Sequence, residues 1–140
     1  MLLEKLCWLT KIVTQIGDAE NFTGLLLGDY ILQNDWMARG KLWKDDSPGS
    51  LSVAMLHALI VTVSIYLCGA LAGYEWPAWK LFIIWFSHGV QDSFRLGTVW
   101  MNWYGQFKHF KESMPEAYVW ATIVVDNVLH LTLLFVLIHT

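Results

Sequence analysis

The chain has 140 residues, and its composition argues against two broad classes of protein. Hydrophobic residues make up 56% and charged residues only 15%, whereas soluble domains carry about 45–50% apolar and about 25% charged residues. The formal net charge is −3 and no basic patch is present, so we expect no nucleic-acid partner. The mean hydropathy of +0.43 instead predicts a small, single-domain integral membrane protein.

Residues 1–20 predict an amphipathic helix. Apolar side chains recur at helical spacing from Leu2 to Ile16, and charged side chains such as Glu4 and Lys11 lie elsewhere around the helix. Such a helix lies in the membrane interface or caps one end of a bundle, and the sequence does not decide between the two.

Residues 21–140 predict an all-α bundle of four transmembrane helices. A spanning helix needs about 20 mostly apolar residues, and segments 50–71 and 117–139 meet this requirement easily. Segment 77–95 is more polar in its second half, and segment 21–38 is the weakest of the four. In 21–38, leucines would face lipid while Asp29 and Gln33, four residues apart, would share a face toward the protein.

The distribution of lysine and arginine predicts the orientation of the bundle. Six of them fall on the side of the connections 39–49 and 97–116, and three fall on the other side. Because cytoplasmic loops carry the excess of positive charge, we expect both connections in the cytoplasm and both termini outside. Tryptophans near the predicted span ends, including Trp36, Trp100 and Trp120, fit an aromatic belt at headgroup depth.

Polar residues within the predicted spans are the most informative part of the sequence. A charge at the bilayer centre costs roughly 2.5–3.5 kcal/mol, so several such residues are expected to meet one another. At about 1.5 Å per residue, one Asp or His of each helix falls roughly 10–15 Å from the same boundary. Two pairs are also four residues apart and so share a helix face. The residues that define this layer and these pairs are Asp29, His57, His88, Asp92, Asp126 and His130.

Imidazole and carboxylate groups together favour a divalent metal ion such as zinc, manganese or iron. We predict metal ligands among Asp29, His57, His88, Asp126 and His130. Asp92 is expected to act as a catalytic base. Alternatively, Asp92 and His130 bind a second ion or orient the imidazoles. Three amides, Gln33, Gln91 and Asn127, would hold ligands or a substrate.

Several motifs resemble a membrane family of bacteria and phages known as domain of unknown function 3307. The run Gly28-Asp29-Tyr30-Ile31-Leu32-Gln33, the later Trp36-Met37 pair and Lys41 resemble its opening signature. LHALIV at His57, SHGVQD at His88 and DNVLH from Asp126 resemble its remaining polar motifs. The resemblance covers about residues 21–135. It implies a small polytopic protein of a bacterial inner membrane or a phage-encoded equivalent, and it brings no activity. The family pattern has a His four residues before its first Asp, where this chain has Leu25.

Four functions are compatible with these residues. The first is a metal-dependent membrane hydrolase, in which the ion activates water. The second is an ion- or proton-conducting protein, because membrane-embedded Asp and His form relays. The third is a haem-binding electron carrier with His57 and His88 or His130 as axial ligands. The fourth is a non-catalytic subunit of a homo-oligomer or larger membrane complex, in which the polar residues only fix the helix packing.

Overall fold

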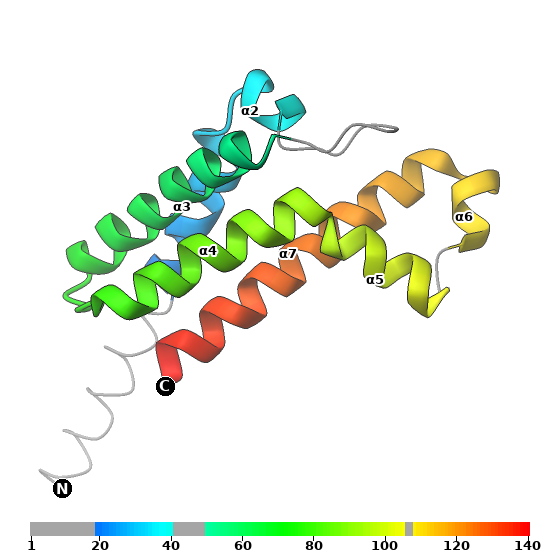
Figure 1. Cartoon of the computed structure of the whole chain (residues 1–140). Coiled ribbons are helices and arrows are strands. Elements are labelled where there is room, and N and C mark those ends of the chain that lie inside the picture. The colour runs from blue at the N-terminus through cyan, green and yellow to red at the C-terminus, as the bar shows by residue number, and fades with distance from the viewer. Residues whose placement is uncertain (1–18, 41–49, 106–107) are drawn as a thin grey trace, which may run out of the picture.

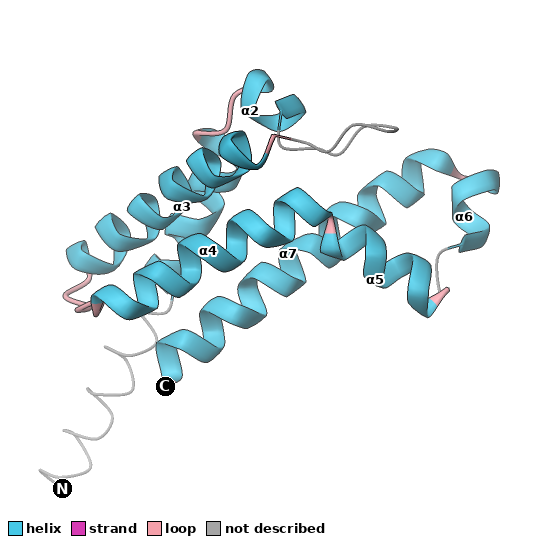
Figure 2. Cartoon of the chain, in the orientation of Figure 1, coloured by secondary structure: helices cyan, strands magenta, loops and turns pink. Residues whose placement is uncertain are grey.

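The computed structural model describes residues 19–40, 50–105 and 108–140. Within these ranges the regular elements are helices and no strand occurs (Figures 1 and 2), which confirms the predicted all-α fold. The predicted amphipathic helix of 1–20 lies outside the described residues except for its last two positions.

The first described helix differs from the continuous span predicted for 21–38. Residues 19–26 are α-helical, and the helix then widens into the π-helix η1, Leu27–Ile31. A short break follows, and α2 spans Asp35–Gly40. The Asn34 side chain causes the restart, because its Oδ1 accepts the backbone N–H of Met37 at 2.9 Å and caps the new helix.

Two glycines hold the first helix against α3, Leu51–Leu71. A Cβ on Gly28 would lie 2.6 Å from the Cα of Val61, and one on Gly24 would lie 2.6 Å from the Cα of Ile65. Only residues without a side chain permit this approach, as at the small-residue interfaces of membrane helices. The approach brings the π-helix that carries Asp29 directly against α3.

Helix α4, Ala78–Phe94, forms an antiparallel hairpin with α3 after a turn at Gly73, whose φ is +79°. Gly89 lies against Met55 and Ala58 of α3, so the two helices approach closely next to His88. The indole N–H of Trp85 donates to the carbonyl of Met55 at 3.0 Å and fixes the register of the pair.

The predicted connection 97–116 is largely helical. Helix α5 spans Leu96–Tyr104, α6 spans Lys108–Ser113, and α7 spans Pro115–His139. Arg95 joins α4 to α5 with φ 49° and ψ 51°, a left-handed conformation that costs a non-glycine residue about 1–2 kcal/mol. The turn directs α5 onto α7 (Figure 1), where Gly97 lies against Asp126.

Two helices, α3 and α7, are long and apolar enough to cross a membrane. Only 44% and 22% of their most apolar stretches are buried, so much of their apolar surface faces outward. The four-span bundle predicted from the sequence is not confirmed in full. Helix α4 has 17 residues, below the length of about 20 that a bilayer requires, and carries several polar side chains. The first helix ends at Ile31.

Candidate metal centre

Four helical segments each contribute to one polar cluster in the centre of the protein. Asp29 comes from the π-helix, His57 from α3, His88 and Asp92 from α4, and His130 from α7. Three of the residues predicted to share one layer, Asp29, His57 and His88, thus converge, although Asp29 lies in a π-turn, whereas the fourth, Asp126, lies outside the cluster. Such turns are frequent at functional sites. The three imidazoles and Asp92 are at most 6% exposed.

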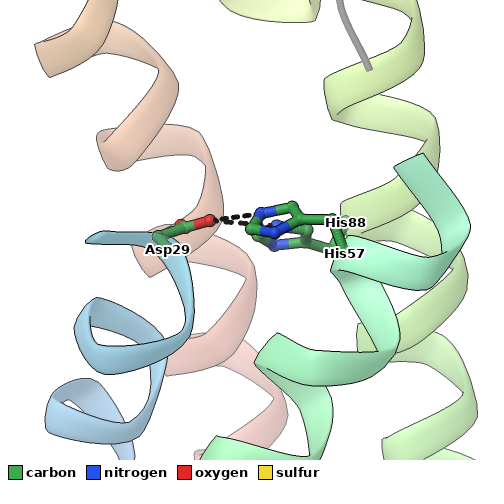
Figure 3. A group of neighbouring side chains, drawn as sticks. All are labelled: Asp29, His57 and His88. Atoms are coloured by element: carbon green, nitrogen blue, oxygen red, sulfur yellow. Dashed lines mark hydrogen bonds and ion pairs between the residues drawn. The ribbon is translucent and has the colours of Figure 1, made fainter. Parts of the chain in front are cut away.

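Asp29 bridges the first two histidines (Figure 3). Its Oδ1 lies 2.9 Å from Nε2 of His57 and 3.3 Å from Nε2 of His88. The two rings are neighbours, with centroids 5.2 Å apart. One carboxylate oxygen and two ring nitrogens therefore face a common point.

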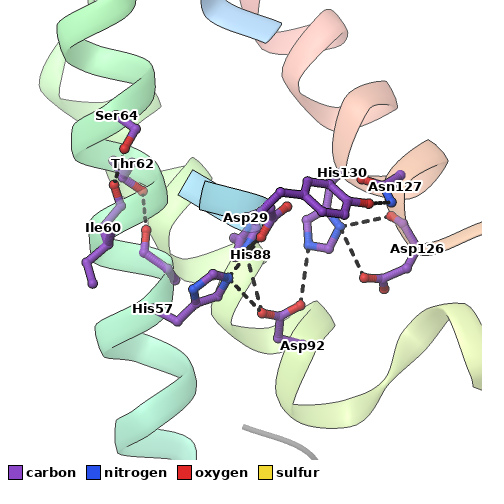
Figure 4. A network of polar contacts seen from close by, with 12 residues as sticks. Asp29, His57, Ile60, Thr62, Ser64, His88, Asp92, Asp126, Asn127 and His130 are labelled. Atoms are coloured by element: carbon purple, nitrogen blue, oxygen red, sulfur yellow. Dashed lines mark hydrogen bonds and ion pairs between the residues drawn. The ribbon is translucent and has the colours of Figure 1, made fainter. Parts of the chain in front are cut away.

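Asp92 closes the cluster from the opposite side (Figure 4). Its Oδ2 lies 3.5 Å from Nε2 of His57 and 3.6 Å from Nε2 of His88, and its Oδ1 lies 3.7 Å from Nε2 of His130. Asp92 is thus the residue that contacts all three histidines, and we name the five residues Asp29, His57, His88, Asp92 and His130 the central cluster.

The spacing and chemistry of the central cluster fit a divalent transition-metal ion. In a tetrahedral site with bonds of about 2.0–2.1 Å, neighbouring ligand atoms lie about 3.4 Å apart. The separations of Asp29 and Asp92 oxygens from the His57 and His88 nitrogens scatter around that value, from 2.9 to 3.6 Å. Two carboxylates would offset the charge of a divalent ion. Two groups of side chains could each hold an ion, Asp29 with His57 and His88, and His88 with Asp92 and His130, and they share His88.

Two ring nitrogens of the central cluster carry a further signal. Among the described side chains, Nδ1 of His57 and Nε2 of His130 are buried and make no hydrogen bond. Nδ1 of His130 donates to the carbonyl of Asp126 at 2.8 Å, which leaves Nε2, the nitrogen toward Asp92, as the one with a lone pair. A backbone carbonyl that fixes the tautomer of an imidazole is the usual support of a metal-site histidine.

The other predicted residues lie around the central cluster or apart from it. Asp126 belongs to neither ligand group; its side chain is 35% exposed and lies 3.7 Å from Nδ1 of His130. The amide nitrogen of Asn127 donates to the Tyr30 hydroxyl and to the carbonyl of Ile123. Gln91 is buried on α4, and Gln33 lies in the break before α2. Leu25 is buried in the apolar core.

Sequence reasoning missed a pocket beside the central cluster. It has a volume of about 300 Å³ and lies between the α4–α5 junction and α7. Asp92 and Asp126 line it together with Arg95, which the sequence singled out only as a charge that sets orientation. The left-handed turn that brings Arg95 there has no sequence signal, because such turns usually contain glycine or asparagine.

Comparison with known proteins places most of the chain in one family. The model of a family described as protein of unknown function, DUF3307, matches residues 22–140, in agreement with the resemblance of the polar motifs. No curated protein and no solved structure matches the chain.

Proposed function

The chain belongs to the DUF3307 family, whose description assigns no function, and we propose that it is a metal-dependent membrane hydrolase. One divalent ion is held by Asp29, His57, His88 and Asp92. The observation that carries the proposal is that one oxygen of Asp29 and one of Asp92 each lie 2.9–3.6 Å from Nε2 of both His57 and His88, close to the spacing of ligand atoms around a tetrahedral ion. The donor set suits zinc, manganese or iron.

A bilayer is the environment that best explains the outer surface. Apolar side chains project from α3, α4 and α7, among them Leu59, Phe86 and Val128, which are 49%, 51% and 54% exposed. Four ionisable side chains of the same helices, His57, His88, Asp92 and His130, are buried instead, as expected of ionisable residues in a membrane. Helices α3 and α7 cross the bilayer, and α4 and the first helix complete a four-helix bundle around the central cluster.

The division of roles among the acidic and imidazole groups follows from the contacts. A divalent ion makes water a nucleophile near neutral pH and polarises a carbonyl or phosphoryl oxygen. Asp92 was expected from the sequence to be the spare base, but its oxygens lie among three imidazoles, which favours a ligand role. His130 is the better base, because its Nδ1–H is bound by Asp126 and its Nε2 can take the proton of the attacking water.

A proton-conducting protein is the second candidate. The supporting observation is a continuous line of contacts from Asp29 through His57, Asp92 and His130 to Asp126, with each step at most 3.7 Å. Imidazole and carboxylate groups at such spacing can pass protons. Proteoliposomes that acidify in response to a potential, and lose this response in His57→Ala, would favour this candidate over the hydrolase.

Elemental analysis of the detergent-purified protein tests the proposed metal site. We expect about one divalent ion per chain in the wild type, and its loss in Asp29→Asn and His88→Ala. His139→Ala is the matched control, because His139 lies exposed at the end of α7, nine residues beyond His130. A wild-type protein that carries no ion after loading with zinc, manganese or iron would refute the site. A loaded protein is then assayed against ester and phosphoester lipids.

A further inference from the structure

The pocket between the α4–α5 junction and α7 differs from the rest of the outer surface of these helices. Its wall includes a cation, Arg95, and an anion, Asp126, together with the hydroxyl-bearing side chains of Thr98, Tyr118 and Thr122. Val119 and Ile123 complete its apolar side and are 57% and 36% exposed on α7. A mostly apolar pocket that also carries a cation and an anion fits a molecule that is itself amphiphilic.

The backbone of Arg95 indicates that this side chain has a role at the pocket. Among the described residues it is the non-glycine residue with positive φ, at 49°, where glycine or asparagine would be less strained. Strained conformations concentrate at functional sites. Three residues earlier on the same segment, Asp92 belongs both to the pocket wall and to the central cluster. The pocket therefore adjoins the proposed metal.

The helices on both sides of the pocket carry exposed tryptophans. Trp100 and Trp103 on α5 and Trp120 on α7 are 50%, 76% and 68% exposed. Tryptophans concentrate at the membrane interface, and Arg95 directly follows the last residue of α4. A lipid bound here would place its polar head between Arg95 and Asp126 and its chains against Val119 and Ile123.

We propose that this pocket binds the head group of a zwitterionic phospholipid that carries a phosphate and a primary ammonium, as in phosphatidylethanolamine. Arg95 binds the phosphate, because a guanidinium donates two parallel hydrogen bonds to phosphate oxygens. Asp126 binds the ammonium, and its carboxylate disfavours head groups that are only anionic. The volume of about 300 Å³ lies at the lower end of the range of about 300–1,000 Å³ for small-molecule sites, which suits a head group better than a whole lipid.

The inference rests on the proposed function only in making this lipid the substrate of the metal centre. Head-group binding is a property of the pocket and is measurable without turnover. Free phosphoethanolamine shares the polar chemistry but has no chains for Val119 and Ile123, so we expect it to bind more weakly than a short-chain lipid with the same head.

Calorimetric titration of the metal-loaded protein in an uncharged detergent tests the pocket. The probes are dihexanoyl phosphatidylethanolamine, dihexanoyl phosphatidylglycerol, dihexanoyl phosphatidylcholine and free phosphoethanolamine. We expect the first to bind most tightly. Arg95→Asn, which removes the charge and tolerates the left-handed backbone, should weaken its binding about tenfold or more, since hydrogen bonds to charged groups are the strong ones. Arg95→Lys keeps the charge but loses the paired hydrogen bonds, so its affinity should lie between those of the wild type and Arg95→Asn.

Asp126→Asn tests the contribution of the ammonium group separately from that of the phosphate. The variant keeps the backbone carbonyl that binds His130 and should remove the preference for phosphatidylethanolamine over phosphatidylglycerol. Arg39→Asn is the control, because Arg39 is an exposed residue of α2 that lines a different pocket.

The outcomes distinguish a failure of the lipid-binding proposal from a failure of the metal-site proposal. The lipid-binding proposal would be wrong if Arg95→Asn and Arg39→Asn bound the lipid equally well. It would also be wrong if the wild type bound the three lipids equally well. In either case, a measured metal content would still support the metal site. Selective, Arg95-dependent binding by a protein that holds no metal would instead support the pocket and refute the hydrolase.

Discussion

Two groups of buried polar side chains differ in how completely their hydrogen bonds are satisfied. At one end of the first helix, the indole N–H of Trp76 donates to Oδ1 of Asn21 at 3.0 Å, and both residues are buried. Gly69 makes room for both side chains. At the centre, two carboxylates meet three imidazoles, and Nδ1 of His57 and Nε2 of His130 make no hydrogen bond.

This difference distinguishes a polar contact that only packs two helices together from a candidate binding site. The Asn21–Trp76 pair is complete within the protein, as expected for a hydrogen bond that fixes helix register. The central cluster instead brings together two carboxylates and the Nε2 atoms of His57 and His88, and a divalent ion bound there would offset the carboxylate charge. If the central cluster only fixed the packing of helices, it would behave like the Asn21–Trp76 pair.

The largest expected difference between the two regions is in metal affinity. Asp29→Asn and His57→Ala should each weaken binding more than about 100-fold, since even the loss of a group that only supports a ligand costs about 10–100-fold. Competition against a coloured chelator measures the affinity. Asn21→Ala should leave it unchanged, and equal effects of His57→Ala and Asn21→Ala would erase the distinction.

The second expectation concerns stability with and without the ion. A ligand that binds only the folded state stabilises it by about 2.7 kcal/mol at 100 times its Kd. Chelation should therefore lower the Tm of the wild type and of Asn21→Ala by a similar amount, and should leave the Tm of His57→Ala unaltered. Thermal unfolding followed by circular dichroism gives the three shifts. A wild-type Tm that changes with neither metal nor chelator would contradict a bound ion.

Two glycine variants test how the fold positions Asp29. Gly28→Ala and Gly24→Ala each place a methyl group 2.6 Å from the backbone of α3 and should each cost about 1–3 kcal/mol in unfolding free energy. Gly28 adjoins Asp29, so Gly28→Ala should also weaken metal binding, whereas Gly24→Ala should weaken it less. Chemical denaturation and metal titration measure the two effects. A larger metal effect from Gly24→Ala would show that the π-helix does not set the position of Asp29.

The smallest expected effect is confined to the end of the bundle. Asn21→Ala leaves the buried indole N–H of Trp76 without its acceptor and should lower stability by about 1–3 kcal/mol. Trp76→Phe removes the donor as well, so the double variant should cost less than the sum of the single ones. Unfolding free energies of the three variants complete the cycle, and strictly additive costs would mean that the hydrogen bond contributes nothing.

The sequence predicted the central cluster better than it predicted the elements that carry it. Helical depth and four-residue spacing identified all five members, because ionisable residues in apolar segments stand out wherever the helix ends fall. The break after Ile31 was missed, since Asn34 looks like any polar residue until it caps α2. That Asp92 and not Asp126 lies among the imidazoles depends on the angle between α4 and α7, which a pattern along one helix does not contain.

X-ray absorption at the metal edge of the loaded protein tests the central claim most directly. The account predicts four nitrogen or oxygen neighbours at about 2.0–2.1 Å if the ion is zinc, with multiple scattering from two imidazoles. Replacement of His57 by Ala should remove one imidazole from that signal, and replacement of Asn21 should not change it. An ion surrounded only by oxygen, or a spectrum identical in the wild type and His57→Ala, would contradict the central cluster as its site.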